Sequence, residues 1–287
     1  MRFEYHAPKT IEEAFSLLDQ YLDRARVIAG GTDLLAQIDA GVHRPEHVID
    51  IEGVGLGYLS FDPSEGLKIG AATPLRTLES SDLLKEKYPA VCSAAGQVGS
   101  VAIRNVGTLG GNICNASPSA DTVPVLIGLG ARLKILGSSG ERVVPLEAFF
   151  TGPGTTLLKG TELLAEVQVP LAPSGTKTAF IKHKIRDSID LAIVNVAAMI
   201  ERDDGVCRDV KLVVGSAGPT VFRAREAEHV LRGKTLNDEG IGRAAALAAK
   251  ESKPITDARG SAGYRRAMIE VLTGRAIRQA GSFTEAG

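Results

Sequence analysis

The chain has 287 residues, of which 44% are hydrophobic and 23% are charged, and its formal net charge is −1. This length suits one large or two medium globular domains, and the near-neutral charge gives no electrostatic case for nucleic acid or an anionic membrane as a partner. No apolar run approaches the roughly 20 residues that cross a bilayer, and the N-terminus lacks the basic-then-apolar order of a signal peptide, so we expect a cytoplasmic protein without a membrane span.

The first part of the chain, to about residue 57, has the pattern of a small βαβ-like subdomain. Thr10 can cap a helix over residues 11–22, because apolar residues recur at i, i+3, i+4 and i+7 from Ile11. The run RVIAG then predicts a strand at 26–30, and a short helix and a second strand follow it, at 33–41 and 47–51.

A second predicted subdomain covers residues 58–175. Its patterns predict, in order, a strand, two helices and two strands: residues 67–73, 74–88, 89–99, 131–137 and 141–146. Pro74 is expected to open the first of these helices. The run at 121–131 is either a helix, for which Asp121 could be the N-cap, or a buried apolar segment.

The segment PLAPSGT at 170–176 is the clearest linker, since it contains two prolines and a glycine. Three strand-like runs and three helices come after it: 177–184, 191–202 and 209–218, then from about 223, 240–251 and 261–280. Strands followed by helices predict a C-terminal α+β domain over residues 176–287 with an antiparallel sheet. The last helix carries four arginines, which we interpret as a solvated face rather than a partner contact: Arg265, Arg266, Arg275 and Arg278.

Two glycine-centred turns, each entered from an apolar run, are the strongest signals in the chain: VIAGGTDLL at 27–35 and VGTLGGNICNASPSA at 106–120. A Gly-Gly pair lacks Cβ atoms and tolerates positive φ, so its backbone N–H groups can close around a pyrophosphate. Hydrogen-bonding residues flank both pairs: Thr32 beside Gly30 and Gly31, and Thr108 and Asn112 beside Gly110 and Gly111. Each pair could also be an ordinary tight turn. Since neither GxGxxG nor GxxxxGK[ST] is present, a dinucleotide would bind in neither the Rossmann nor the P-loop way.

Cysteine and histidine usage predicts no metal site. Three cysteines occur at wide spacings without a CxxC pair: Cys92, Cys114 and Cys207. A disulfide framework, a zinc site and an iron–sulfur cluster are therefore excluded, and buried packing is favoured for all three thiols. His43 and His47 are four residues apart, but Pro45 between them breaks the helix that would align them.

Four segments in this order resemble one family, the flavoprotein (medium) subunits of molybdenum hydroxylases, which includes those of xanthine dehydrogenase and aerobic carbon monoxide dehydrogenase. The segments are AGGTDL (29–34), IRNVGTLGGNICNASPSAD (103–121), FFTGPGTT (149–156) and ITDARGSAGYRRAM (255–268). The resemblance implies an α+β fold: a two-subdomain FAD-binding domain of the PCMH type over residues 1–175, with subdomains of about 1–57 and 58–175. A C-terminal domain of the carbon monoxide dehydrogenase flavoprotein type would follow over 176–287.

The resemblance also implies a function. Such a subunit binds FAD non-covalently, receives electrons from the [2Fe–2S] clusters of a small partner subunit, and passes them to NAD, a quinone or another acceptor. The molybdenum cofactor is expected on a large partner subunit, so the substrate of the complex is not specified by this chain. No catalytic side chain is then expected here, because FAD is the redox centre.

The resemblance further implies which residues contact the cofactor. Two turns would wrap the pyrophosphate and nearby polyol oxygens: Ala29, Gly30, Gly31, Thr32, Asp33 and Leu34, and Thr108, Gly110, Gly111 and Asn112. Ser117 and Asp121 match positions near the polyol or adenosine portion of FAD, whereas Leu164 and Lys182 match positions near the flavin ring.

Structural roles stay open for several of these residues. Asp33 and Asp121 stand where helix N-caps are expected, and Lys182 could lie on a solvated strand face; near the ring, its charge would stabilise negative charge on the flavin. The loop at 184–190 matches a segment that covers the flavin in relatives. Without an aromatic residue, this loop would leave the ring open to a small acceptor, or it could simply be a charged solvent loop.

Two other functions are compatible with the sequence. One is a stand-alone FAD-dependent reductase of the same fold, like the UDP-N-acetylenolpyruvoylglucosamine reductases. The other is a non-enzymatic scaffold or assembly protein whose glycine turns bind nothing. Bound flavin would distinguish the scaffold from both enzymes, and co-purifying molybdenum and iron would distinguish the two enzymes.

Overall fold

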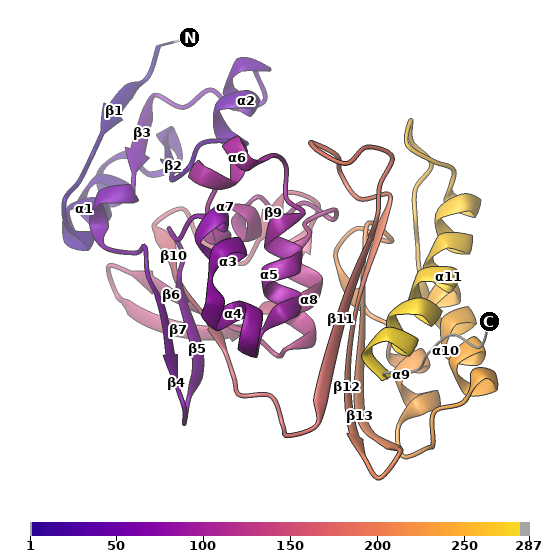
Figure 1. Ribbon diagram of the computed structural model, residues 1–287. Coiled ribbons are helices and arrows are strands. Elements are labelled where there is room, and N and C mark those ends of the chain that lie inside the picture. The colour runs from indigo at the N-terminus through magenta and orange to yellow at the C-terminus, as the bar shows by residue number, and fades with distance from the viewer. Residues whose placement is uncertain (1, 282–287) are drawn as a thin grey trace. The chain divides into compact units, whose positions relative to one another are not determined.

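The computed structural model describes residues 2–281, which form two compact units (Figure 1). The first unit contains the described residues up to Leu78, with Ser100–Ala116 and Ala131–Leu171; the second contains Glu79–Gly99, Ser117–Gly130 and the described residues from Ala172 onward. Two segments from the first half of the chain therefore pack with the C-terminal strands. No helix within residues 2–281 is long and apolar enough to cross a bilayer.

A small parallel sheet with strand order β1-β3-β2 begins the first unit. Its strands and the helices between them are β1 (Glu4–His6), α1 (Ile11–Tyr21), β2 (Ala25–Ile28), α2 (Leu34–Asp39) and β3 (His47–Asp50). Thr10 caps α1 as predicted, because its side chain accepts a hydrogen bond from the Glu13 N–H at 3.2 Å, while Ala14 and Leu18 are buried. The βαβ-like pattern is confirmed, and β1 is an additional strand that the sequence did not predict.

The larger sheet of the first unit is antiparallel, with strand order β4-β5-β10-β6-β7. Its strands are β4 (Leu59–Asp62), β5 (Gly66–Gly70), β6 (Arg132–Gly137), β7 (Gly140–Pro145) and β10 (Glu162–Val169). A hairpin of β8 (Phe150–Gly152) and β9 (Thr155–Thr156) precedes β10. The sequence predicted β5, β6 and β7 but not β4 or β10.

Short helices between these strands differ most from the sequence prediction. Where one helix was expected over 74–88, the chain forms α3 (Leu75–Ser80) and α4 (Asp82–Lys87), because the Ser81 hydroxyl accepts the Leu84 N–H and starts a new helix. Helix α5 (Pro89–Gly96) agrees with the prediction, and α8 (Thr122–Gly128) is a helix in which every residue is buried. Two further helices were not predicted: α6 (Val101–Val106) ends where the second glycine segment begins, and α7 (Leu109–Cys114) lies within that segment.

The second unit has three layers around an antiparallel sheet with strand order β11-β12-β13-β14. Its strands are β11 (Thr176–His183), β12 (Val194–Asp203), β13 (Val206–Gly215) and β14 (Phe222–Arg223), and its later helices are α9 (Arg225–Leu231), α10 (Asp238–Glu251) and α11 (Ala262–Gly281). Helices α5 and α8 lie on one face of this sheet and α9 to α11 on the other (Figure 1). The predicted antiparallel α+β arrangement is confirmed.

One residue of the arginine-bearing last helix is not solvated as the sequence predicted. Arg265 is buried, and its guanidinium donates to the backbone carbonyl of Ile193 at 2.6 Å and to the Asp257 carboxylate at 2.7 Å. Its charged hydrogen bonds therefore connect α11 to the residue just before β12 and to the loop that contains Asp257. Helical periodicity alone cannot show this, because the partners are far from Arg265 in sequence.

Candidate functional site

The first glycine turn connects β2 to α2 in the first unit. Gly31 has φ of +69°, as expected of a residue that must be glycine, and α2 begins three residues later. Asp33 occupies the N-cap position, but its side chain makes no capping hydrogen bond. Much of the Asp33 residue is exposed to solvent. Its carboxyl group is partly desolvated, and this desolvation raises the pKa of the group.

Consecutive backbone N–H groups at this turn have no protein partner. Within the part of the chain that the structure describes, the N–H groups from Gly30 to Asp33 donate to no acceptor, whereas the Leu35 N–H bonds to the Gly31 carbonyl at 3.0 Å. A run of free N–H groups at a Gly-Gly turn before a helix is a typical anion-binding geometry. This turn can therefore accept a phosphate or pyrophosphate group.

The second glycine segment has a different structure from the open turn that the sequence predicted. Gly110 and Gly111 lie in the first turn of α7 and have no positive φ. Thr108 caps this helix, and its hydroxyl accepts the Gly111 N–H at 3.0 Å. The N–H groups of Leu109 and Gly110 bond to backbone carbonyls. These donors are already used, so α7 does not form a second nest of free N–H groups.

The two glycine segments nevertheless touch each other within the first unit. A Cβ atom on Gly30 would lie 1.9 Å from the carbonyl oxygen of Val106, just before the cap of α7. On the other side of the contact, a Cβ on Gly107 would lie 3.5 Å from the Thr32 hydroxyl oxygen. Gly30 is therefore required for close backbone approach rather than for positive φ. The α6–α7 connection therefore packs directly against the first turn.

A side-chain hydrogen bond that the sequence did not indicate also joins these segments. The Gln37 amide on α2 donates to the Asn115 side-chain oxygen, just after α7, at 3.1 Å. Gly110 is packed tightly as well, because a Cβ there would lie 2.6 Å from the Ala71 carbonyl oxygen. Leu164, on β10 of the same unit, is only 4% exposed, so its side chain has little free surface for a ligand.

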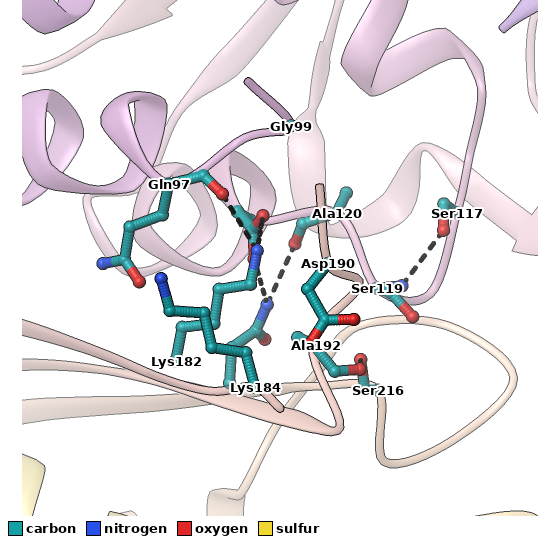
Figure 2. Close-up of polar contacts among 12 residues, drawn as sticks. Gln97, Gly99, Ser117, Ser119, Ala120, Lys182, Lys184, Asp190, Ala192 and Ser216 are labelled. Carbon is teal, nitrogen blue, oxygen red and sulfur yellow. Dashed lines mark hydrogen bonds and ion pairs between the residues drawn. The ribbon is translucent and has the colours of Figure 1, made fainter. Parts of the chain in front are cut away.

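Two candidate residues of the second unit, Asp121 and Lys182, form a buried ion pair (Figure 2). The Lys182 ammonium on β11 donates to the Asp121 carboxylate at 2.7 Å and to the Gln97 carbonyl at 2.9 Å. The two side chains are only 1% and 7% exposed. Lys182 is thus not on a solvated strand face, and Asp121 makes no capping hydrogen bond to α8. The ion pair therefore replaces the two structural roles that the sequence left open, helix capping by Asp121 and a solvated strand face for Lys182.

The electrostatics of the pair are set by burial. Desolvation raises the pKa of Asp121 to about 6, and the attraction of Lys182 opposes that rise without cancelling it. Asn195, which sequence reasoning missed, donates its side-chain amide to the other Asp121 oxygen at 3.3 Å. The ammonium is therefore neutralised, and the isolated positive charge that the sequence suggested for the flavin ring is not present.

Ser117 and the loop at 184–190 also belong to the second unit. The Ser117 hydroxyl accepts the Ser119 N–H at 3.2 Å, which shapes the local turn. The Asp190 carboxylate accepts the Ile185 and Arg186 N–H groups, which lowers its pKa and closes the loop upon itself. Ile189, with φ of +51°, donates its N–H to the Gly99 carbonyl at 3.0 Å, so the loop has defined backbone partners.

Of the three cysteines that were expected to be buried, Cys207 is buried, whereas Cys92 and Cys114 are half-buried. Burial raises the pKa of Cys114 to about 12 and that of Cys207 to about 11, so neither is a thiolate near neutral pH.

Comparison with known proteins matches two consecutive parts of the chain to two families. Residues 1–172 match the family described as FAD binding domain in molybdopterin dehydrogenase, and residues 179–280 match the CO dehydrogenase flavoprotein C-terminal domain. The glyceraldehyde dehydrogenase medium chain of Sulfolobus acidocaldarius is 34% identical over 96% of this chain and 98% of its own length. The xanthine dehydrogenase FAD-binding subunit of Escherichia coli O157:H7 is 32% identical over 96% of this chain and 95% of its own.

A solved structure is similar throughout. A chain of carbon monoxide dehydrogenase from Hydrogenophaga pseudoflava, in a form lacking the Mo-pyranopterin moiety of the molybdenum cofactor, superposes with a TM-score of 0.95. It is 34% identical, and the match covers 98% of both chains.

Proposed function

Because the chain belongs to the family of FAD-binding medium subunits of molybdenum hydroxylases, we propose that it works as the electron-transfer flavoprotein of such a complex. It is an oxidoreductase subunit, and its own redox group is FAD. In the proposal, electrons arrive from the [2Fe–2S] clusters of a small partner subunit and leave to NAD, a quinone or another acceptor. A large partner subunit would hold the molybdenum cofactor and determine the substrate.

The free N–H groups from Gly30 to Asp33 are the observation that carries this proposal. FAD contains a pyrophosphate, whose oxygens need several donors in a small volume, and this turn offers consecutive donors without internal partners. The close contact of Gly30 with the Val106 carbonyl holds the turn in place before any ligand binds. A preformed site loses less conformational entropy on binding than one that must be ordered.

We propose that the second glycine segment contacts the cofactor mainly with side chains and with exposed backbone atoms. Gly111 is exposed and Asn112 is half-buried, so both can reach a ligand beside α7. Ala29, Leu34, Thr108 and Gly110 also belong to the proposed set in the first unit. In the second unit, Ser117, Asp121 and Lys182 remain proposed cofactor positions, as does Leu164 in the first.

Bound FAD supplies redox chemistry that the chain lacks, since it exchanges electrons singly or in pairs. The protein's part is to hold the cofactor and set the polarity around it. The buried Asp121–Lys182 pair contributes a dipole rather than a net charge.

The two-domain division belongs to the proposal as well. An FAD-binding domain over 1–175 and a C-terminal domain over 176–287 are supported by family matches that end at 172 and begin at 179. We also propose a cytoplasmic location, where the free thiols of Cys92, Cys114 and Cys207 would stay reduced.

The absorption spectrum of the chain purified alone tests the proposal. We expect flavin bands near ~450 nm, with FAD released into the supernatant after heat denaturation. A folded, colourless protein that also takes up no added FAD would overturn the flavoprotein function and favour a scaffold. Turnover of a nicotinamide by the isolated chain on a small substrate would instead favour a stand-alone reductase.

A further inference from the structure

Three potential metal ligands converge on one face of the small parallel sheet, and none of them is among the residues proposed to contact FAD. Glu4 and His6 are two residues apart on β1, so their side chains point to the same face of the sheet. In the parallel register, Glu4 lies opposite His47 of β3. The pairing of these strands therefore brings together residues that are more than 40 positions apart in the sequence.

The distances among the ligand atoms fit a metal ion. His6 Nε2 lies 3.1 Å from His47 Nδ1, and His47 Nδ1 lies 3.4 Å from Glu4 Oε2. All three ligand atoms lie within 4.8 Å of one another. For zinc ligands at about 2.0–2.2 Å, tetrahedral geometry separates neighbouring ligand atoms by about 3.3–3.5 Å. The Glu4–His47 distance of 3.4 Å already has this length, and the His6–His47 distance of 3.1 Å is slightly shorter.

Hydrogen bonding alone explains this arrangement poorly. His47 Nδ1 faces a second imidazole nitrogen and a carboxylate oxygen at the same time. A proton on Nδ1 can point well at only one of these two acceptors. A cation between the three atoms accepts a lone pair from each of them, so it satisfies all three groups together.

Packing holds His47 in place, whereas the Glu4 side of the cluster is open to solvent. The Tyr21 ring stacks on the His47 ring at 3.6 Å between centroids, and the His47 side chain is only 11% exposed. Glu4, by contrast, has 65% of its side chain exposed. A metal ion could enter from the Glu4 side, and water could take the remaining coordination position.

We propose that Glu4, His6 and His47 form a binding site for a divalent transition-metal ion such as Zn²⁺. Two imidazoles and one carboxylate suit zinc and its neighbours, whereas magnesium and calcium prefer oxygen ligands. The bound ion would connect β1, which has only three residues, to the central strand of its sheet. Its role is structural: it fastens the N-terminal edge strand. The sequence analysis expected no metal site because it considered the spacing of ligands along the chain and not across paired strands.

Zinc binding to the full-length chain, prepared without a polyhistidine tag and treated with a chelator, tests this site. After dialysis against micromolar Zn²⁺ with excess Mg²⁺, we expect one zinc per chain by elemental analysis. Zinc should also raise the unfolding temperature of the chain, because an ion that binds only the folded state stabilises it. Cobalt(II) in the same site should give visible ligand-field absorption.

Matched variants decide the assignment. His6→Gln and Glu4→Gln should each weaken zinc binding at least about tenfold and abolish or reduce the thermal shift, while circular dichroism stays native. His229→Gln, an exposed histidine on α9, should leave both unchanged. No zinc on the wild-type chain, or equal zinc on the wild type and His6→Gln, would overturn the proposal. FAD content serves as a separate readout and should not change in any of these variants.

Discussion

At the level of single residues, the buried Asp121–Lys182 pair makes stability depend on pH. The pKa of Asp121 is about 6 in the folded chain, above the ordinary value of about 4. Between these values the folded state binds more protons than the unfolded state, so the unfolding free energy falls as pH rises from about 4 to about 6. The contribution is complete below pH 4 and lost above pH 6.

We therefore expect Asp121→Asn to remove part of this pH dependence. The difference in unfolding free energy between wild type and variant should decline by up to about 2–3 kcal/mol from pH 4 to pH 6.5 and then stay constant. Urea denaturation at several pH values measures it. Parallel curves for the two proteins would show that Asp121 titrates normally.

Removing the cation should be costly at neutral pH. Lys182→Met leaves the Asp121 carboxylate buried without its partner, and breaking a buried pair typically costs about 3–5 kcal/mol. Lys177→Met, on the same strand but exposed, should change stability by less than about 0.5 kcal/mol. Denaturation at pH 7 compares the two, and equal stabilities would mean that the Lys182 ammonium is not buried in an ion pair.

At the level of secondary-structure elements, the cap of α7 should matter for ligand binding as well as stability. Thr108→Val keeps the side-chain volume but removes the acceptor of the Gly111 N–H, which should cost about 1 kcal/mol. The start of α7 adjoins Val106, which supports Gly30, so FAD affinity should also fall several-fold.

A matched cap variant separates the two effects. Thr10→Val removes the cap of α1 and should cost a similar free energy without changing FAD affinity. Urea denaturation and FAD titration measure both variants. If Thr108→Val and Thr10→Val bind FAD equally well, α7 does not support the first glycine turn.

Elements with strong local signals could be predicted from the sequence, and the others could not. Helix α1 has a cap and a clear apolar period, and the first glycine turn has Gly31 at positive φ. Helices α6 and α7 have six residues each, too few for a periodic pattern. Strand β10 reads ELLAEVQV, whose glutamates suggest exposure, but Glu166 is buried and accepts a hydrogen bond from Tyr58 at 2.6 Å.

The candidate site shows the same limit. Glycine motifs and family resemblance identified the residues of the first turn. The partners that define their environment come from distant segments: Val106 against Gly30, Gln37 with Asn115, and Asn195 with Asp121. Sequence spacing does not contain such contacts, because tertiary packing creates them.

At the level of the whole molecule, the proposed role requires partner subunits that hold the [2Fe–2S] clusters and the molybdenum cofactor. Expressed alone, the chain should contain FAD but neither molybdenum nor acid-labile sulfide. Expressed with the small and large subunits, it should co-purify with both, measured by elemental and sulfide analysis. A chain that stays alone under co-expression and reduces a small substrate by itself would contradict the electron-transfer role.

The affinity of the apo-chain for FAD, compared between wild type and Gly30→Ala, tests the central claim most directly. The added Cβ would lie 1.9 Å from the Val106 carbonyl oxygen, so the turn must move and its N–H groups lose their alignment. We expect affinity to fall by about 100-fold, or about 2.7 kcal/mol, while Gly242→Ala in α10, where nothing lies within 4 Å, leaves it unchanged. A folded Gly30→Ala chain that binds FAD as tightly as wild type would show that this turn does not hold the cofactor.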